Sequence, residues 1–144
     1  RFADVADYFG NKGYKTVFFG GPMDLDMVKP VVEQMKTSPI VATGAFKLGP
    51  LAAAMKWCDL LITNDSGPMH VAISQGVSIV ALYGPSNPFF YGPYQAKSIV
   101  LESMDHYEIG KSMKQVIKEG KYKGISVITE EQVIKAAETL LQES

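Results

Sequence analysis

The chain has 144 residues, enough for one domain with a substantial apolar core. Hydrophobic residues make up 47% and charged residues 20%, which is the composition of a globular protein. The formal net charge of −1 argues against a nucleic-acid partner, because such proteins usually carry a basic excess. The single cysteine cannot form an internal disulfide, and no apolar run reaches the roughly 18 residues that suggest a membrane span.

The first residues have the pattern of a helix that is already under way. Apolar residues at positions 2, 5, 6 and 9 fall on one face of an amphipathic helix, which ends near Gly10 or Gly13. Neither an initiator methionine nor an N-cap residue precedes this helix. We therefore expect that the chain starts inside a helix and is a piece of a longer protein.

Apolar runs of strand length alternate with helical patterns along the chain. Pro30 requires the second helix to begin near Lys29 or to be kinked, because proline fits only the first helical turn. Strict alternation of strands and helices implies right-handed crossovers. The sequence thus predicts a single α/β domain over residues 1–144 with a parallel sheet. Its expected strands cover residues 16–20, 39–42, 60–63, 79–83 and 98–101.

Two further helices have recognisable first residues. Pro50 suits the first position of a helix that continues to about Trp57, with Cys58 as a small core residue. Thr129 and Gln132 have the spacing of a capping box, in which each residue satisfies an amide of the other. Apolar residues recur at helical spacing after them, so the last helix is predicted to start here.

A polar turn, Asn64 to His70, joins a predicted strand to the next helix, which Pro68 is expected to open. Gly67 allows close approach of the backbone, and the free amides at the helix N-terminus favour an anion. The simpler interpretation is that Asp65 or Ser66 only caps the helix and that His70 is a partly buried histidine. The candidate ligand-binding residues are Asp65, Ser66, Gly67, Pro68, Met69 and His70.

Two more turns follow predicted strands at their carboxyl ends. Residues 83–88 leave the strand after the first turn, so the two turns should lie beside each other. Residues 20–24 follow the first strand and could approach a phosphate or a base. Rigid proline turns are the simpler interpretation of such composition. These turns add Gly84, Ser86, Gly20 and Gly21 as candidates.

Several familiar site patterns are missing from the sequence. It has neither the GxGxxG dinucleotide fingerprint nor a GxxxxGK[ST] phosphate loop, and its histidines and cysteine form no metal-ligand cluster. A run of lysines near the C-terminus is interpreted as a solvated helix face, and the alternative is a patch that contacts anionic lipid. These lysines are Lys111, Lys114, Lys118, Lys121 and Lys123.

The segment Asp59 to Pro93 resembles glycosyltransferase family 9, the bacterial lipopolysaccharide heptosyltransferases of the GT-B class. That family carries a D-S/T-G-x-x-H turn between a strand and a helix, and F/Y-G-P-T/S-x-P after the next strand. Here the two motifs occupy residues 65–70 and 83–88, in the same order and at the same spacing. Weaker matches extend over most of the chain, at residues 20–22, 43–44 and 128–129.

The resemblance implies the C-terminal half of a GT-B enzyme: a Rossmann-like parallel sheet with helices on both faces that binds a nucleotide-sugar donor. The whole protein would transfer a sugar, typically heptose from ADP-heptose, to a lipid-linked or saccharide acceptor of the lipopolysaccharide core. The catalytic base would come from an N-terminal domain, and no metal or cofactor is implied. The implied location is the cytoplasm, with peripheral contact at the inner membrane.

The resemblance also assigns parts of the donor to residues. By position, Asp65, Ser66, Gly67 and His70 would line the diphosphate and sugar. Residues near the nucleotide would be Gly20, Gly21, Thr43, Gly44 and Ala45. Many relatives have a basic residue directly after the position of Gly44, whereas this chain has Ala45 there and Lys47 two places later. The preceding strand has Val41 and Ala42 where some members carry an acidic residue for the ribose.

Two other functions fit the same scaffold. A sugar-nucleotide epimerase of GT-B shape would act on a UDP-sugar with carboxylates and histidines. A non-catalytic nucleotide-sugar-binding module is a different class, because a fold does not fix a function. The epimerase would consume a sugar nucleotide without any acceptor, and the module would bind one without consuming it.

Overall fold

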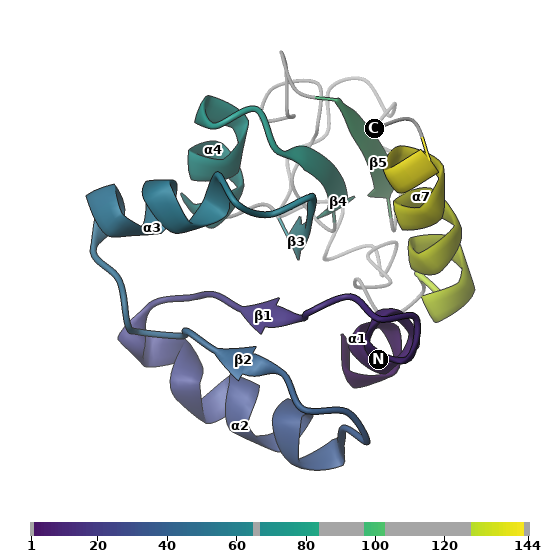
Figure 1. Ribbon diagram of the computed structural model, residues 1–144, viewed down its shortest axis with the longest axis horizontal. Coiled ribbons are helices and arrows are strands. Elements are labelled where there is room, and N and C mark those ends of the chain that lie inside the picture. Colours follow the sequence, from purple (N-terminus) through teal and green to yellow (C-terminus); the bar gives the residue numbers. More distant parts are fainter. Residues whose placement is uncertain (1, 65–66, 84–96, 103–127, 143–144) are drawn as a thin grey trace, which may run out of the picture. The chain divides into compact units, whose positions relative to one another are not determined.

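Figure 1 shows the computed structural model of the chain, which describes residues 2–64, 67–83, 97–102 and 128–142. The chain divides into two compact units, Arg1–Ala54 and Met55–Ser144. Each unit contains a parallel sheet, β1-β2 in the first and β3-β4-β5 in the second. The run of lysines near the C-terminus lies outside the described residues.

The first unit begins with helix α1 (Phe2–Asn11), as the sequence predicts. Its buried residues are Ala3, Val5 and Phe9. The helix ends where Gly13 takes a φ of +94°, a conformation that glycine adopts without steric cost. The amide of Tyr14 donates to the carbonyl of Phe9 at 3.0 Å, which completes the C-terminal cap.

One side chain joins α1 to the loop that precedes the second strand. The carboxylate of Asp7 accepts hydrogen bonds from the Thr37 hydroxyl at 2.6 Å and from the Lys36 and Thr37 amides at 2.9 Å each. The Thr37 hydroxyl, and then these two amides, hold the pKa of Asp7 below its usual value. No residue type in the sequence predicts this tertiary contact.

The strands of the first unit are shorter than predicted. β1 (Val17–Phe18) pairs in parallel with β2 (Ile40–Val41), with Val17 opposite Ile40. A 3₁₀ helix, η1 (Pro22–Asp24), and helix α2 (Leu25–Gln34) connect them. The glycines and proline that follow β1 end its ladder early.

Two helices in this unit begin earlier than the sequence predicts. Helix α2 begins at Leu25, so a start near Lys29 is wrong, and Pro30 lies in the interior of the helix and supplies no amide for its hydrogen bonds. The other alternative, a kink at Pro30, stays a prediction. The η1 turn starts the helix earlier than the proline alone would suggest. Helix α3 (Leu48–Met55) likewise begins two residues before Pro50, which still lies in its first turn.

The second unit has a three-stranded parallel sheet. Its strands are β3 (Leu60–Asn64), β4 (Ser78–Tyr83) and β5 (Ser98–Glu102), with β4 in the centre. β3 and β5 each pair with β4 over five residues. All three match predicted strands to within one residue, because their apolar runs are bounded by turn residues.

Helices cover both faces of this sheet. Helix α4 (Gly67–Ser74) packs on β3 and β4, and helix α7 (Glu130–Gln142) packs on all three strands. Figure 1 shows the two helices on opposite sides of the strands. The prediction of helices on both faces is confirmed in this unit. The sequence predicts a single sheet, whereas the described strands form two sheets. Neither β1 nor β2 is hydrogen-bonded to β3, β4 or β5 as a neighbouring strand.

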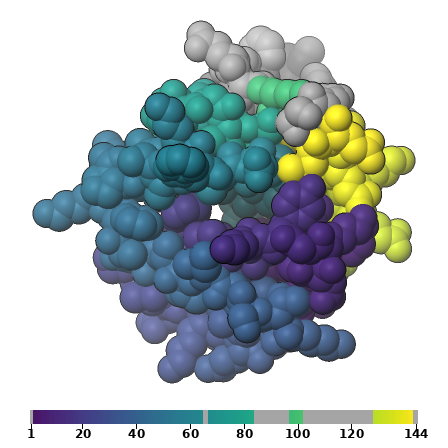
Figure 2. Space-filling model, in the orientation of Figure 1, coloured from purple at the N-terminus to yellow at the C-terminus, as the bar shows by residue number. Residues whose placement is uncertain are grey.

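Helix α7 starts with the predicted capping box. The Thr129 amide donates to Oε1 of Gln132 at 2.8 Å, and the Gln132 amide donates to Oγ1 of Thr129 at 3.2 Å. Its apolar face is buried, and Figure 2 shows its outer face, in yellow, uncovered. None of the described helices is long and apolar enough to cross a bilayer.

The end of α3 differs from its prediction. Cys58 is half-buried, and this desolvation, together with the neighbouring Asp59, raises the pKa of its thiol. Trp57 is 89% exposed, so the inward face ends before it, at the buried Met55.

The assignment of residues 1–144 to a single donor-binding domain stays a prediction.

Candidate functional site

The carboxyl ends of β3 and β4 bring the starts of the two motif turns together. In the parallel ladder Asn64 is paired with Leu82, and Tyr83 follows as the last residue of β4. The turn after Asn64 and the turn after Tyr83 therefore leave the same edge of one sheet from neighbouring strands. This confirms the prediction that the two strands are adjacent. Four candidate residues, Asp65, Ser66, Gly84 and Ser86, lie outside the described residues.

Helix α4 supplies the amides at this edge. It begins at Gly67, one residue before the predicted Pro68, and its first-turn amides have no partner within the helix. The positive end of the helix dipole lies at the same place, and both features favour an anion. Met69 is fully buried beneath this turn, whereas His70 is exposed. The interpretation of His70 as a partly buried histidine is therefore wrong.

A buried contact joins α4 to the end of β4. The Tyr83 hydroxyl lies 3.6 Å from Sδ of Met69, and both side chains are 0% exposed. Because side chains alternate along a strand, Ile79 and Ala81 share the face of Tyr83, and Val80 and Leu82 face the other way. Tyr83 therefore lies on the α4 face of the sheet, beneath the first turn of the helix.

In the first unit, the loops that follow β1 and β2 pack tightly on each other. The Gly44 amide donates to the Gly20 carbonyl at 2.8 Å. Gly44 has a φ of +76°, and a Cβ there would lie 3.2 Å from Cα of Pro22. Thr43 is buried, and its hydroxyl donates to the Phe18 carbonyl at 3.2 Å. The structure thus brings together four predicted residues: Gly20, Gly21, Thr43 and Gly44.

A carboxylate that the sequence-based prediction omits sits in this turn. Oδ2 of Asp24 accepts a hydrogen bond from the Gly21 amide at 2.8 Å, as the N3 residue of η1. That amide is therefore engaged, and the carboxylate would repel a phosphate while it could accept hydrogen bonds from hydroxyl or amino groups. The three-residue spacing from Gly21 to Asp24 is the signal that could have revealed this cap.

Lys47 occupies a different position from the glycine turn. It is exposed just before α3, and its carbonyl accepts the Leu51 amide at 2.9 Å. Next to it, the ring of Phe46 lies 6.4 Å from that of Phe19, centroid to centroid. The assignment of Lys47 to donor binding remains a prediction from the resemblance.

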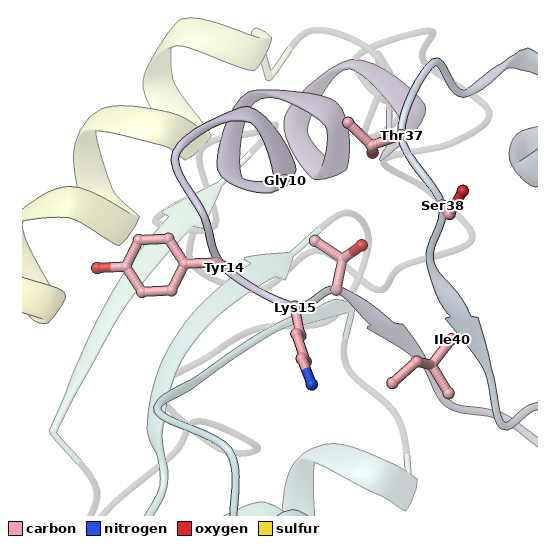
Figure 3. A pocket seen from close by; sticks show the side chains of 7 residues that line it. Gly10, Tyr14, Lys15, Thr37, Ser38 and Ile40 are labelled. Atoms are coloured by element: carbon pink, nitrogen blue, oxygen red, sulfur yellow. The ribbon is translucent and has the colours of Figure 1, made fainter.

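A hollow of about 350 Å³ lies at the opposite ends of β1 and β2. Figure 3 shows that Tyr14, Lys15 and Ser38 extend in different directions rather than toward one point. None of the predicted site residues lines this hollow. A ligand site needs polar groups that converge, so the hollow is not a candidate site. Within the described ranges no three His, Cys, Asp or Glu side chains gather as metal ligands.

The parallel sheets with helices on both faces of β3-β4-β5 define a Rossmann-like α/β protein, and in such folds ligands bind at the carboxyl ends of neighbouring strands. Residues 1–123 match the sequence profile of a family described as "Glycosyltransferase family 9 (heptosyltransferase)". The chain belongs to this family, as its two motifs predict.

Relatives of the chain are named as heptosyltransferases. The chain is 30% identical to "Lipopolysaccharide heptosyltransferase 2" of Salmonella typhimurium, over 99% of this chain and 42% of that protein. It is 29% identical to "Lipopolysaccharide core heptosyltransferase OpsX" of Haemophilus influenzae, over 92% of this chain and 40% of that protein. The chain thus spans about two fifths of the length of these relatives.

Two solved structures have the same fold. A family 9 glycosyl transferase from Veillonella parvula is 80% identical with a TM-score of 0.94, over 99% of this chain and 41% of that chain. The E. coli protein described as "ADP-heptose lps heptosyltransferase II" is 28% identical with a TM-score of 0.81, over 99% of this chain and 40% of that chain. The α/β fold class predicted from the sequence, that of a GT-B glycosyltransferase, is confirmed.

Proposed function

We propose that the protein represented by this chain transfers a heptose from ADP-heptose, or a related nucleotide sugar, to an acceptor of the lipopolysaccharide core. This chain binds the donor. The observation that carries the proposal is the family 9 match over residues 1–123, with heptosyltransferases among the relatives. The adjacent exits of β3 and β4, from which both motif turns leave, support it.

The chemistry of sugar transfer explains the role of α4. When the bond between the sugar and the diphosphate breaks, negative charge develops on the leaving diphosphate. Amides fixed at a helix N-terminus stabilise such charge without any reorganisation. In α4 these amides belong to Gly67 and Met69, since Pro68 has none. The resemblance adds Asp65 and Ser66 on the diphosphate and sugar side, and places the catalytic base in an N-terminal domain.

The acceptor determines where the protein works. A lipid-linked acceptor would hold the enzyme at the cytoplasmic face of the inner membrane through peripheral contact. Co-sedimentation with vesicles that contain anionic lipid tests this contact. Binding that falls as salt concentration rises is expected if the lysine run takes part, because exposed charges are screened by salt. Binding to neutral vesicles alone would contradict that role.

Gly67 offers a direct test of donor binding. Its φ is not in the left-handed region, and a Cβ would meet no described atom within 4 Å. The described part of the fold therefore accepts Gly67→Ala, and a methyl group there would crowd a ligand that approaches the backbone. We expect the variant to fold normally and to raise the KM for ADP-heptose about tenfold, which corresponds to about 1.4 kcal/mol.

The assay uses a chimera in which this chain replaces its counterpart in the Veillonella parvula protein, which matches it at 80% identity. Gly49→Ala is the matched control, because a Cβ added at Gly49 would also meet no described atom within 4 Å and the residue lies in another helix, α3. It should leave the KM unchanged. A chimera that does not transfer heptose from ADP-heptose would overturn the proposal, and consumption of donor without acceptor would favour an epimerase.

A further inference from the structure

The strongest unassigned feature is the buried contact between the last residue of β4 and the first turn of α4. Tyr83 and Met69 are each 0% exposed, and the Tyr83 hydroxyl lies 3.6 Å from the Met69 sulfur. Neither side chain can touch a ligand in solvent from these positions. Any effect they have on a ligand must therefore act through the backbone that they support.

Met69 is the third residue of α4, so its side chain anchors the first turn of the helix, whose amides have no partner within the helix. A helix side chain points back toward the helix N-terminus and covers the turn before its own Cα. The depth at which Met69 sits therefore sets the height of the first turn above the sheet. The Tyr83 side chain contacts Met69 from the side of the sheet.

Tyr83 is also the residue from which the second motif turn leaves. Its backbone is paired with Glu102 of β5, and the preceding Leu82 is paired with Asn64 of β3. The same residue thus fixes the exit of the turn after β4 through its backbone and the first turn of α4 through its side chain.

We propose that Tyr83 is a positioning residue, whose ring holds the first turn of α4 in register with the carboxyl end of β4. This inference rests on the proposed function, because the register matters only if a donor binds at this edge. We assign the effect to the ring, because it supplies the bulk of the Tyr83 side chain that is buried with Met69. Tyr83→Phe should therefore preserve function, and Tyr83→Leu should not.

The test compares the steady-state kinetics of chimera variants with ADP-heptose, well below their unfolding temperatures. Tyr83→Leu should raise the donor KM about tenfold while the acceptor KM stays unchanged, because displacements near 1 Å are costly to aligned groups. Tyr83→Phe should stay within about twofold of the parent. Met69→Val shortens the other side of the contact and should also raise the donor KM, which decides the matter if Tyr83→Leu does not fold.

Ile79→Val is the matched control. Ile79 is 0% exposed on the same face of β4, but at the far end of the strand from the turn. It should lower the unfolding temperature without changing the donor KM. If Tyr83→Leu and Met69→Val behave like Ile79→Val, with lower stability and an unchanged donor KM, the positioning role is wrong while the proposed function stands. If the unsubstituted chimera does not turn over ADP-heptose, both proposals fail.

Discussion

The sheets of the two units show how differently similar apolar runs can be buried. In β4, the five residues from Ile79 to Tyr83 are all buried. In β2, by contrast, Ile40 is 53% exposed and Val41 is 47% exposed. Both segments contain an Ile–Val pair and are bounded by turn residues, so these local features do not distinguish them.

The difference comes from what surrounds each strand. β4 has a strand on both sides and a helix on both faces, which removes its side chains from water. Among the described residues, β2 pairs only with β1, and helix α2 contributes no buried residue. Burial of a parallel strand is therefore a property of its neighbours, and the stability of each unit should follow it.

The largest expected effect is on the free energy of unfolding, and it is seen when two isoleucines, one in each sheet, are compared. Ile79→Ala should lower the free energy of unfolding by about 2–5 kcal/mol, because it leaves a cavity in a closed core. Ile40→Ala should cost about 1 kcal/mol or less, because half of that side chain is already in water. Urea denaturation followed by circular dichroism measures both. Equal losses would contradict the link between burial and neighbours.

A smaller effect on stability is expected in the loops, where Gly44 of the first unit is more tightly packed than Gly76 of the second. Gly44→Ala should cost about 1–2 kcal/mol for the left-handed backbone, and more because the new Cβ would lie 3.2 Å from Pro22. Gly76 in the second unit has a φ of +72° but no described atom within 4 Å of an added Cβ, so Gly76→Ala carries the backbone cost alone. The unfolding temperature of Gly44→Ala should therefore be lower than that of Gly76→Ala. The reverse order would mean that the Gly44 contact is not tight.

The smallest expected effect is a pH dependence in the first unit. The folded-state pKa of Asp7 is lowered from 3.8, so its hydrogen bonds stabilise the fold above that pH and are lost as pH falls through the folded value. Asp7→Asn should therefore lower the unfolding temperature at pH 7 and converge with the parent in acid. Glu33→Gln, at an exposed position of α2, is the control and should leave the unfolding temperature at pH 7 unchanged. A constant difference across this range would contradict the role of the carboxylate.

Local signals in the sequence account for much of the fold. The apolar periodicity and the Thr129–Gln132 spacing correctly place α7, and turn residues correctly bound β3 and β4. The start of α2 is predicted wrongly because Pro30 is a local signal that the preceding η1 turn overrides. The exposure of Trp57 and Ile40 depends on tertiary neighbours, which no local pattern contains.

The candidate site divides in the same way. The strand–turn–helix pattern predicts a helix that opens at Pro68, and α4 begins one residue earlier, at Gly67, because glycine and proline mark this junction. The pairing of Gly44 with Gly20 could only be inferred from the resemblance, since the two are far apart in the sequence. The Asp24 cap is local and its spacing from Gly21 could have revealed it, whereas the Tyr83–Met69 contact depends on three-dimensional packing.

The length of α4 limits how its motif could be transferred to another protein. The helix has eight residues, and isolated helices shorter than about 12–15 residues are marginal in water. Its first turn is therefore ordered by the sheet beneath it and not by its own sequence. A peptide cut from residues 64–74 would lose the aligned amides. To keep these amides aligned in another protein, the transferred segment must include β3 and β4, with Tyr83 at the end of β4.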